Sequence, residues 1–100
     1  MVKLIALYKQ PEDKEAFDEH YKNVHTPITK KIPGLRKMEV TRIVGSPTGD
    51  SKYYLLCEMY YDDHESLKKA MKTEESKASG KDLMSFAGNL VTMMVGEEVE

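Results

Sequence analysis

The 100-residue sequence contains one cysteine, no tryptophan, two phenylalanines and no long apolar run. A single cysteine excludes an intrachain disulfide and any cysteine-rich zinc motif. The 15 Lys and Arg side chains nearly balance the 17 Asp and Glu side chains, so the formal net charge is −2. That balance disfavours a nucleic-acid-binding protein, which needs a strongly basic face. No apolar run approaches the ~20 residues of a membrane-spanning helix. From the charge balance and the short apolar runs, we expect neither a nucleic acid nor a membrane as a partner.

The remaining composition, 40% hydrophobic and 32% charged, is typical of a globular protein. The length predicts a single domain over residues 1–100. The apolar run at the N-terminus is too short for a signal peptide, and we therefore expect a cytoplasmic protein. Cys57 lies in an apolar run, which predicts a small buried thiol rather than a reactive one.

Apolar periodicity predicts strands over Val2–Lys9, Leu35–Val44, Tyr53–Tyr61 and Leu90–Val95. A first helix begins at Pro11 and is expected to end or kink near His25, because Pro27 disfavours helical geometry at Thr26. Its predicted buried stripe consists of four residues: Phe17, Tyr21, Val24 and Ile28.

A second helix is predicted after Asp62, which forms a capping-box pattern with Glu65. Gly80 is expected to interrupt this helix, and its last turn should end near Gly88. The order strand, helix, strand, strand, helix, strand predicts an α+β ferredoxin-like fold, βαββαβ, with a four-stranded antiparallel sheet.

The first, third and fourth strands are apolar on both alternating sets of positions. Strands of this kind are buried on both faces, yet two helices on one side cover only one face. We therefore expect a second copy of the chain on the other face, since isologous dimers are the commonest oligomers. The alternative is an exposed apolar patch, which is uncommon on monomers.

Several segments together resemble the EthD-like family of the dimeric α+β-barrel superfamily. They are Tyr8–Asp13, Phe17–Tyr21, Val24–Ile28 with its His-x-Pro sequence, Ile32–Lys37, and an Asp-Leu-x-x-Phe turn at Asp82, Leu83 and Phe86. The resemblance implies a homodimeric α+β barrel that binds a small hydrophobic molecule in a cleft between sheet and helices. The wider superfamily includes cofactor-free cyclases and monooxygenases, haem-degrading monooxygenases and isomerases, so the resemblance does not select the reaction.

His25 is the main catalytic candidate, because it matches the family's His-x-Pro sequence and lies at the expected end of the first helix. The dipole of a helix C-terminus favours an imidazolium, so we expect its pKa to rise and to suit a general acid or base. The alternative is that His25 only caps the terminal carbonyl groups. On a regular helix His20 would lie about 140° away from His25, which disfavours a shared metal, and we expect no metal site.

Tyr21 is the second catalytic candidate, since it lies on the same helix stripe and offers an aromatic wall with a polar hydroxyl. His20, Phe17 and Met93 are predicted to contact the substrate, while His64 is expected to be exposed to solvent. Glu58, the lone charge of the third strand, is expected to pair with a Lys or Arg across the dimer, and a buried acid is the alternative. Ordinary core packing is the alternative for the aromatic and methionine side chains.

Together these features predict a small-molecule enzyme of EthD type, oxidoreductase-like and cofactor-independent, with a hydrophobic or aromatic substrate. A monooxygenase and a polyketide cyclase are both compatible with the pattern, and the sequence does not decide whether the chain is catalytic at all. A haem-binding or haem-degrading protein is one alternative, with His20 or His25 as the axial ligand. A non-catalytic binding or accessory protein is the other.

Overall fold

The computed structural model describes all residues, 1–100, and contains the predicted order of strands and helices. Its elements are β1 (Val2–Lys9), α1 (Lys14–His20), η1 (Tyr21–His25), α2 (Thr26–Thr29), β2 (Lys37–Arg42), β3 (Tyr53–Tyr61), α3 (His64–Ala70), α4 (Glu74–Ala87) and β4 (Val91–Glu97). The strands pair antiparallel in the order β2-β3-β1-β4. The fold is thus the predicted α+β ferredoxin-like fold. No helix is both long and apolar enough to cross a membrane.

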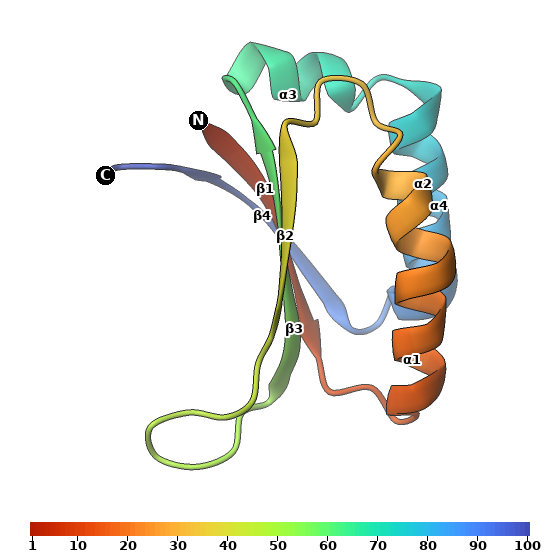
Figure 1. The fold of residues 1–100 in the computed structure, drawn as a ribbon, viewed down its shortest axis with the longest axis vertical. Coiled ribbons are helices and arrows are strands. Elements are labelled where there is room, and N and C mark those ends of the chain that lie inside the picture. Colours follow the sequence, from red (N-terminus) through yellow and green to blue (C-terminus); the bar gives the residue numbers. More distant parts are fainter.

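The helices α1, α2 and α4 all cover the same face of the sheet, and the opposite face carries no helix (Figure 1). Side chains alternate along β1, so that Val2, Leu4, Ala6 and Tyr8 point toward the helices and pack into the core. The partners opposite them on β3 follow the same alternation. The core therefore lies between the sheet and the helical layer.

A β-bulge near the end of β1 turns two successive residues of β3 toward the helices. Tyr8 pairs with Leu55 and Lys9 pairs with Tyr53, which leaves Tyr54 as the extra residue. The Tyr54 ring packs edge-on against Phe17, with ring centroids 5.6 Å apart. The bulge thus adds an aromatic side chain to the core at the α1 end of the sheet.

The first helical segment continues past the predicted end at His25, as far as Thr29. One turn between Tyr21 and His25 is a π-helix, in which the Thr26 N–H donates to the Tyr21 carbonyl five residues earlier. Pro27 has no N–H, and its ring would clash with the carbonyl four residues before it in a regular α-helix. The wider π turn accommodates the proline inside the helix instead of ending it.

The π turn also changes which residues are buried. The buried residues follow one another at a constant spacing of four: Phe17, Tyr21, His25 and Thr29. In an α-helix a spacing of four drifts around the axis, and the extra residue of the π turn compensates for that drift. The prediction of Val24 in the buried stripe was wrong, since Val24 is 40% exposed.

The second helical segment also differs from its prediction. Asp63 rather than Asp62 caps α3, and its carboxylate accepts the Ser66 N–H at 2.8 Å. Asp62 is instead bound by the Arg36 guanidinium through two hydrogen bonds.

The helical segment is interrupted between α3 and α4, where the Thr73 hydroxyl caps α4. It is not interrupted at Gly80, which lies inside α4. A glycine inside a helix costs only about 0.5–1 kcal/mol, which the packing of α4 outweighs. The predicted helix end at Gly88 is confirmed, because Gly88 follows the last residue of α4.

Candidate functional site

A small chamber of about 80 Å³ lies between the sheet and α4. Ten of its fourteen lining residues are hydrophobic, and they include Leu4 and Ala6 of β1, Met59 of β3 and Leu83 of α4. Its polar groups come from a few side chains only: His25, Ser76, Ser79, Tyr8, Tyr61 and Cys57. Mostly apolar walls with a few polar groups are typical of small-molecule sites.

The mouth of the chamber is formed by residues that both line it and reach solvent. Met71 is 49% exposed and Met93 is 39% exposed, and Gly80 lies beside them in the lining. A Cβ atom built at Gly80 would meet no other atom within 4 Å, so glycine leaves open space here. The predicted substrate contact Met93 is therefore placed at the entrance of the chamber.

His25 lies in the wall of the chamber and is only 5% exposed. Its Nδ1 atom lies 2.9 Å from Oδ2 of Asp82 on α4, and its Nε2 atom lies 3.4 Å from the Thr29 hydroxyl. Burial lowers the pKa of His25, although the Asp82 carboxylate partly opposes this shift.

Two expectations for His25 were therefore wrong. Because the helix continues to Thr29, the ring is not at a C-terminus and gains no increase in pKa from the helix dipole. The ring also makes its hydrogen bonds to side chains and caps no terminal carbonyl group.

His20 binds the other oxygen of the same carboxylate, with its Nε2 atom 2.9 Å from Oδ1 of Asp82. The prediction of an angle of about 140° between His20 and His25 holds only for a regular α-helix. The π turn between them provides i→i+5 bonding, which brings residues five apart onto one face. Both imidazoles consequently meet one carboxylate.

Two buried hydroxyls extend this network on the other side of His25. The Thr29 hydroxyl lies 3.4 Å from Nε2 of His25 and 2.7 Å from the Ser79 hydroxyl, which lines the chamber. Thr29, His25 and Asp82 thus have the connectivity of a nucleophile, base and acid triad. Thr29 is fully buried and lies outside the chamber lining, so its oxygen cannot reach a substrate there. The arrangement therefore suits proton transfer rather than acyl transfer.

Phe86 of α4 packs against both histidines, with ring centroids 4.3 Å from His20 and 5.3 Å from His25. On its other side it lies 5.5 Å from the Phe17 ring. Phe17, His20 and Phe86 line a separate surface groove that also contains Glu12 and Asp13. The predicted substrate contacts are therefore divided, with Met93 at the chamber beside the catalytic candidate His25, and Phe17 and His20 at the groove.

Tyr21 is buried against the His25 and Tyr8 rings, with centroids 5.4 and 5.7 Å away. Its hydroxyl is buried and has no hydrogen-bond partner. Burial raises the pKa of Tyr21, with the nearby Cys57 thiol and Tyr8 hydroxyl adding to the increase, so the phenol stays protonated. Tyr21 thus packs against the His25 ring, and its hydroxyl remains without a hydrogen-bond partner.

The other side chains considered from the sequence have the following places. Cys57 is buried as predicted, and burial raises the pKa of its thiol to about 11. Glu58 forms an ion pair as expected, but its partner is Lys3 of the same chain, 2.6 Å away, and not a residue across a dimer. His64 is exposed as predicted and contacts Glu97.

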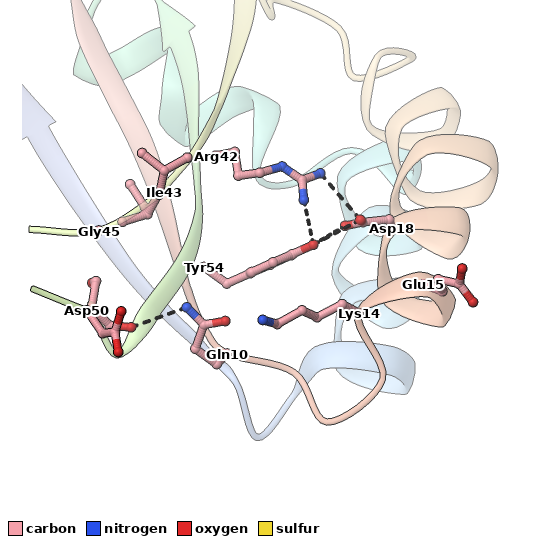
Figure 2. Close-up of a pocket in the computed structure, with 11 residues that line it drawn as sticks. Gln10, Lys14, Glu15, Asp18, Arg42, Ile43, Gly45, Asp50 and Tyr54 are labelled. Carbon is pink, nitrogen blue, oxygen red and sulfur yellow. Dashed lines mark hydrogen bonds and ion pairs between the residues drawn. The ribbon is translucent and has the colours of Figure 1, made fainter.

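A larger hollow of about 720 Å³ opens at the surface beside the β2–β3 loop (Figure 2). Two cations line it, Lys14 and Arg42, and Arg42 already donates to the Tyr54 hydroxyl at 2.7 Å and to the Asp18 carboxylate at 3.3 Å. The Tyr54 hydroxyl in turn donates to Asp18. These polar groups satisfy one another at the surface, so the hollow offers no buried, unpaired reactive group, and the His25 chamber is the better candidate site.

The sequence reasoning missed the partners that complete the site: Asp82, Thr29, Ser79 and Gly80. Asp82 and Phe86 were visible only as part of the Asp-Leu-x-x-Phe turn. The available signal for Thr29 was the spacing of four that links Phe17, Tyr21, His25 and Thr29. That spacing, with a proline among these residues, indicates a π turn rather than a helix end.

Comparison with known proteins agrees with this fold. An EthD family protein from Bacillus halodurans C-125, solved by crystallography, is 75% identical, with 99% of both chains covered and a TM-score of 0.97. An 11.0 kDa protein encoded in the thcB–thcC intergenic region of Rhodococcus erythropolis is 26% identical over 98 residues, which is 98% of this chain and 95% of that protein.

Two more distant solved structures share the fold alone. A dimeric protein of ferredoxin-like fold from Bacteroides fragilis has a TM-score of 0.65 at 21% identity, covering 97% of this chain and 95% of that one. SnoaB from Streptomyces nogalater, a cofactor-independent oxygenase solved as a point mutant, has a TM-score of 0.71 at 10% identity, covering 99% and 93%. The EthD domain model matches residues 9–89, most of the chain including both histidines and Asp82, and the protein therefore belongs to the EthD domain family.

Proposed function

We propose that this protein is a small-molecule enzyme in which His25 acts as the general base of the chamber. One observation carries the proposal: the buried His25 ring lines an apolar chamber while Asp82 holds its Nδ1 atom at 2.9 Å. A carboxylate in this position fixes the tautomer with the proton on Nδ1, so that Nε2 keeps its lone pair. Asp82 also stabilises the imidazolium that forms when Nε2 accepts a proton.

The lowered pKa of His25 supports this role, because it keeps the imidazole neutral and able to accept a proton at neutral pH. Ser79 lines the chamber and can hydrogen-bond to a polar group of the substrate, while the buried Thr29 hydroxyl lies on the Nε2 side of the ring and helps to orient it. A positioned base of this kind contributes about 10²–10⁴-fold to a reaction rate.

The substrate that fits these walls is a small hydrophobic or aromatic molecule with one acidic O–H or C–H group. The volume of about 80 Å³ is smaller than the ~150 Å³ cavity that holds benzene. Met71 and Met93 at the mouth must therefore move to admit an aromatic ring, which the flexible thioether side chain permits. Tyr21 would then shape the pocket through its packing against His25.

We propose no resident cofactor, in line with the oxygenase SnoaB, which is described as cofactor-independent and shares the fold. Proton removal from the substrate is the step common to an oxygenase and a cyclase, and the chain's own residues suffice for it. The chamber is well below the ~300–1,000 Å³ of typical ligand and cofactor pockets, and a haem would have to displace far more of its lining than a single aromatic ring would. These features disfavour His25 as a haem ligand.

We also propose that the protein is a homodimer that packs sheet against sheet. The face of the sheet without helices carries four apolar side chains: Ile5, Leu7, Leu56 and Met94. The Lys3–Glu58 ion pair lies on the same face. The related fold from Bacteroides fragilis is described as dimeric. Light scattering should give twice the chain mass of 11.4 kDa, and Leu56→Glu should halve that mass without unfolding the protein.

The function is tested by a screen of phenols, quinones and haem against wild type, His25→Gln and, as a control, His64→Gln. We expect wild type and His64→Gln to bind and convert a phenol or quinone, while His25→Gln binds it but loses about 10²–10⁴-fold in turnover. Binding without conversion in all three proteins would favour a non-catalytic binding protein. A Soret shift with haem that vanishes in His25→Gln would favour the haem alternative and overturn the proposal.

A further inference from the structure

The two histidines on Asp82 lie in very different surroundings. The His25 side chain is 6% exposed and faces the chamber, whereas the His20 side chain is 31% exposed and faces the surface groove. The Asp82 side chain between them is 13% exposed. One carboxylate therefore connects a histidine that meets the substrate chamber with a histidine that meets solvent.

Charge counting limits how many protons this cluster can hold. Two imidazoliums beside one carboxylate would give the partly buried cluster a net positive charge. With both histidines neutral, the cluster would carry a net negative charge. One imidazolium makes the cluster neutral, which is the state that poor solvation favours. The two histidines therefore compete for one proton, and His20 in its protonated form opposes protonation of His25.

The other titratable groups around the cluster do not disturb this count. Tyr21 packs against His25, while Tyr8, Cys57 and Tyr61 line the chamber together with His25. Burial raises the pKa of these four groups, so they remain neutral. Glu12 and Asp13 line the groove on the His20 side, so they add negative charge at the exposed side of the cluster and none at the chamber.

This inference rests on the proposed role of His25 as a base. We propose that His20 is the proton-exchange residue of the site: it holds the shared proton at rest and releases it to solvent when His25 accepts a proton from a ligand in the chamber. No hydrogen bond to protein occupies the Nδ1 atom of His20, and the ring is partly exposed in the groove, so that atom is available to water.

The step balances without a further reactant. Before transfer, His20 carries protons on both nitrogens, His25 carries one on Nδ1, and Asp82 is ionised. The ligand then gives its proton to Nε2 of His25, and His20 gives its Nδ1 proton to water. His20 keeps its Nε2 proton on Asp82 throughout, so the cluster stays neutral and no proton passes through the carboxylate.

The first test is an NMR titration of ligand-free protein labelled with ¹⁵N in its histidines. We expect His20 to become the imidazolium first as pH falls, while His25 stays in its Nδ1–H form. His20→Gln keeps a hydrogen-bond donor for Asp82 but removes the competing charge, so it should move the His25 midpoint to higher pH; His64→Gln should not move it. An unchanged His25 midpoint in His20→Gln would overturn the proposal.

The second test measures proton release when the tightest-binding phenol of the screen binds, by calorimetry in buffers of different ionisation enthalpy. At a pH where His20 is protonated, wild type and His64→Gln should release protons as the phenol binds, in proportion to the fraction of the phenol that His25 deprotonates in the chamber. His20→Gln should release none. Equal release from all three proteins would overturn the role of His20. If no phenol binds in the chamber, the proposed function fails while the titration of the free protein still decides whether the two histidines share one proton.

Discussion

Nδ1 of His25 lies 2.9 Å from Oδ2 of Asp82, although 57 residues separate them in the chain. This contact joins the π turn of the first helical segment to the middle of α4, and it fixes the ring at the wall of the chamber. The hydrogen bond therefore does two things. It ties two helices together, and it gives a buried histidine the tautomer that a base requires.

The burial of His25 predicts how stability depends on pH. The pKa of His25 is lower in the folded protein than its usual 6.5, so the unfolded state binds the proton more readily. The free energy of unfolding should consequently fall as pH decreases from about 6.5 toward the lowered folded pKa, by at most about 1.4 kcal/mol per pH unit for one proton. Urea unfolding at a series of pH values measures this slope.

His25→Gln should flatten the slope in that interval, whereas the exposed His64→Gln should leave it unchanged. Paired carboxylates such as Asp62, whose pKa is lowered by Arg36, become protonated only at more acidic pH. They therefore do not contribute to the pH dependence of stability just below about pH 6.5. A slope below about pH 6.5 that is the same in wild type and His25→Gln would contradict the burial of a neutral imidazole.

Gly80 allows stability and access to the chamber to be separated. Gly80→Ala should raise the free energy of unfolding by about 0.5–1 kcal/mol, since it lies inside α4 and a Cβ atom there meets nothing within 4 Å. Ala78→Gly, at an exposed position of the same helix, should cost a similar amount and serves as the reverse control. Gly80→Leu should close the chamber to ligands that bind wild type. Undiminished binding in a folded Gly80→Leu protein would show that ligands enter elsewhere.

Tyr21→Phe tests the unpartnered hydroxyl. Removing a buried hydroxyl that has no hydrogen-bond partner should leave the free energy of unfolding unchanged or raise it by up to about 1 kcal/mol. Tyr54→Phe is the matched control, because its hydroxyl donates to Asp18 and accepts from Arg42, and it should lower stability. Ligand binding in the chamber should be unchanged, because Tyr21 lies outside the chamber lining. A marked loss of stability would mean that the hydroxyl has a partner in solution.

Cys57 should be nearly inert in the folded protein. Burial raises the pKa of its thiol to about 11, so little thiolate is present at about pH 8. A thiol reagent should label the native protein slowly and the urea-unfolded protein at the rate of a free cysteine. Rapid labelling of the native form would show that the β3 strand is accessible near the chamber.

The fold was accessible from the sequence because its signals are local. The apolar runs Val2–Lys9 and Tyr53–Tyr61 indicated two strands with their correct bounds, and Gly88 marked the end of the last helix. These features depend on neighbouring residues and on the period of a strand or helix.

The candidate site was only partly accessible, because its geometry depends on two nonlocal facts. On a regular α-helix the five-residue spacing would place His20 and His25 on different faces, and only the π turn brings them onto one face. The π turn forms because Pro27 must fit inside a helix that tertiary packing holds in place. The partner Asp82 comes from α4, and no local pattern connects it with the histidines. The pKa of His25 was likewise misjudged, since its burial depends on tertiary packing.

The central claim, that the chamber binds a substrate against His25, is tested most directly by a crystal structure with the tightest-binding phenol of the screen. We predict that the ring displaces Met71 and Met93 and occupies the chamber, with the phenol oxygen within hydrogen-bond distance of His25 Nε2 or the Ser79 hydroxyl. A phenol bound in the surface hollow beside Arg42 and Tyr54, with the chamber closed and His25 untouched, would contradict the account.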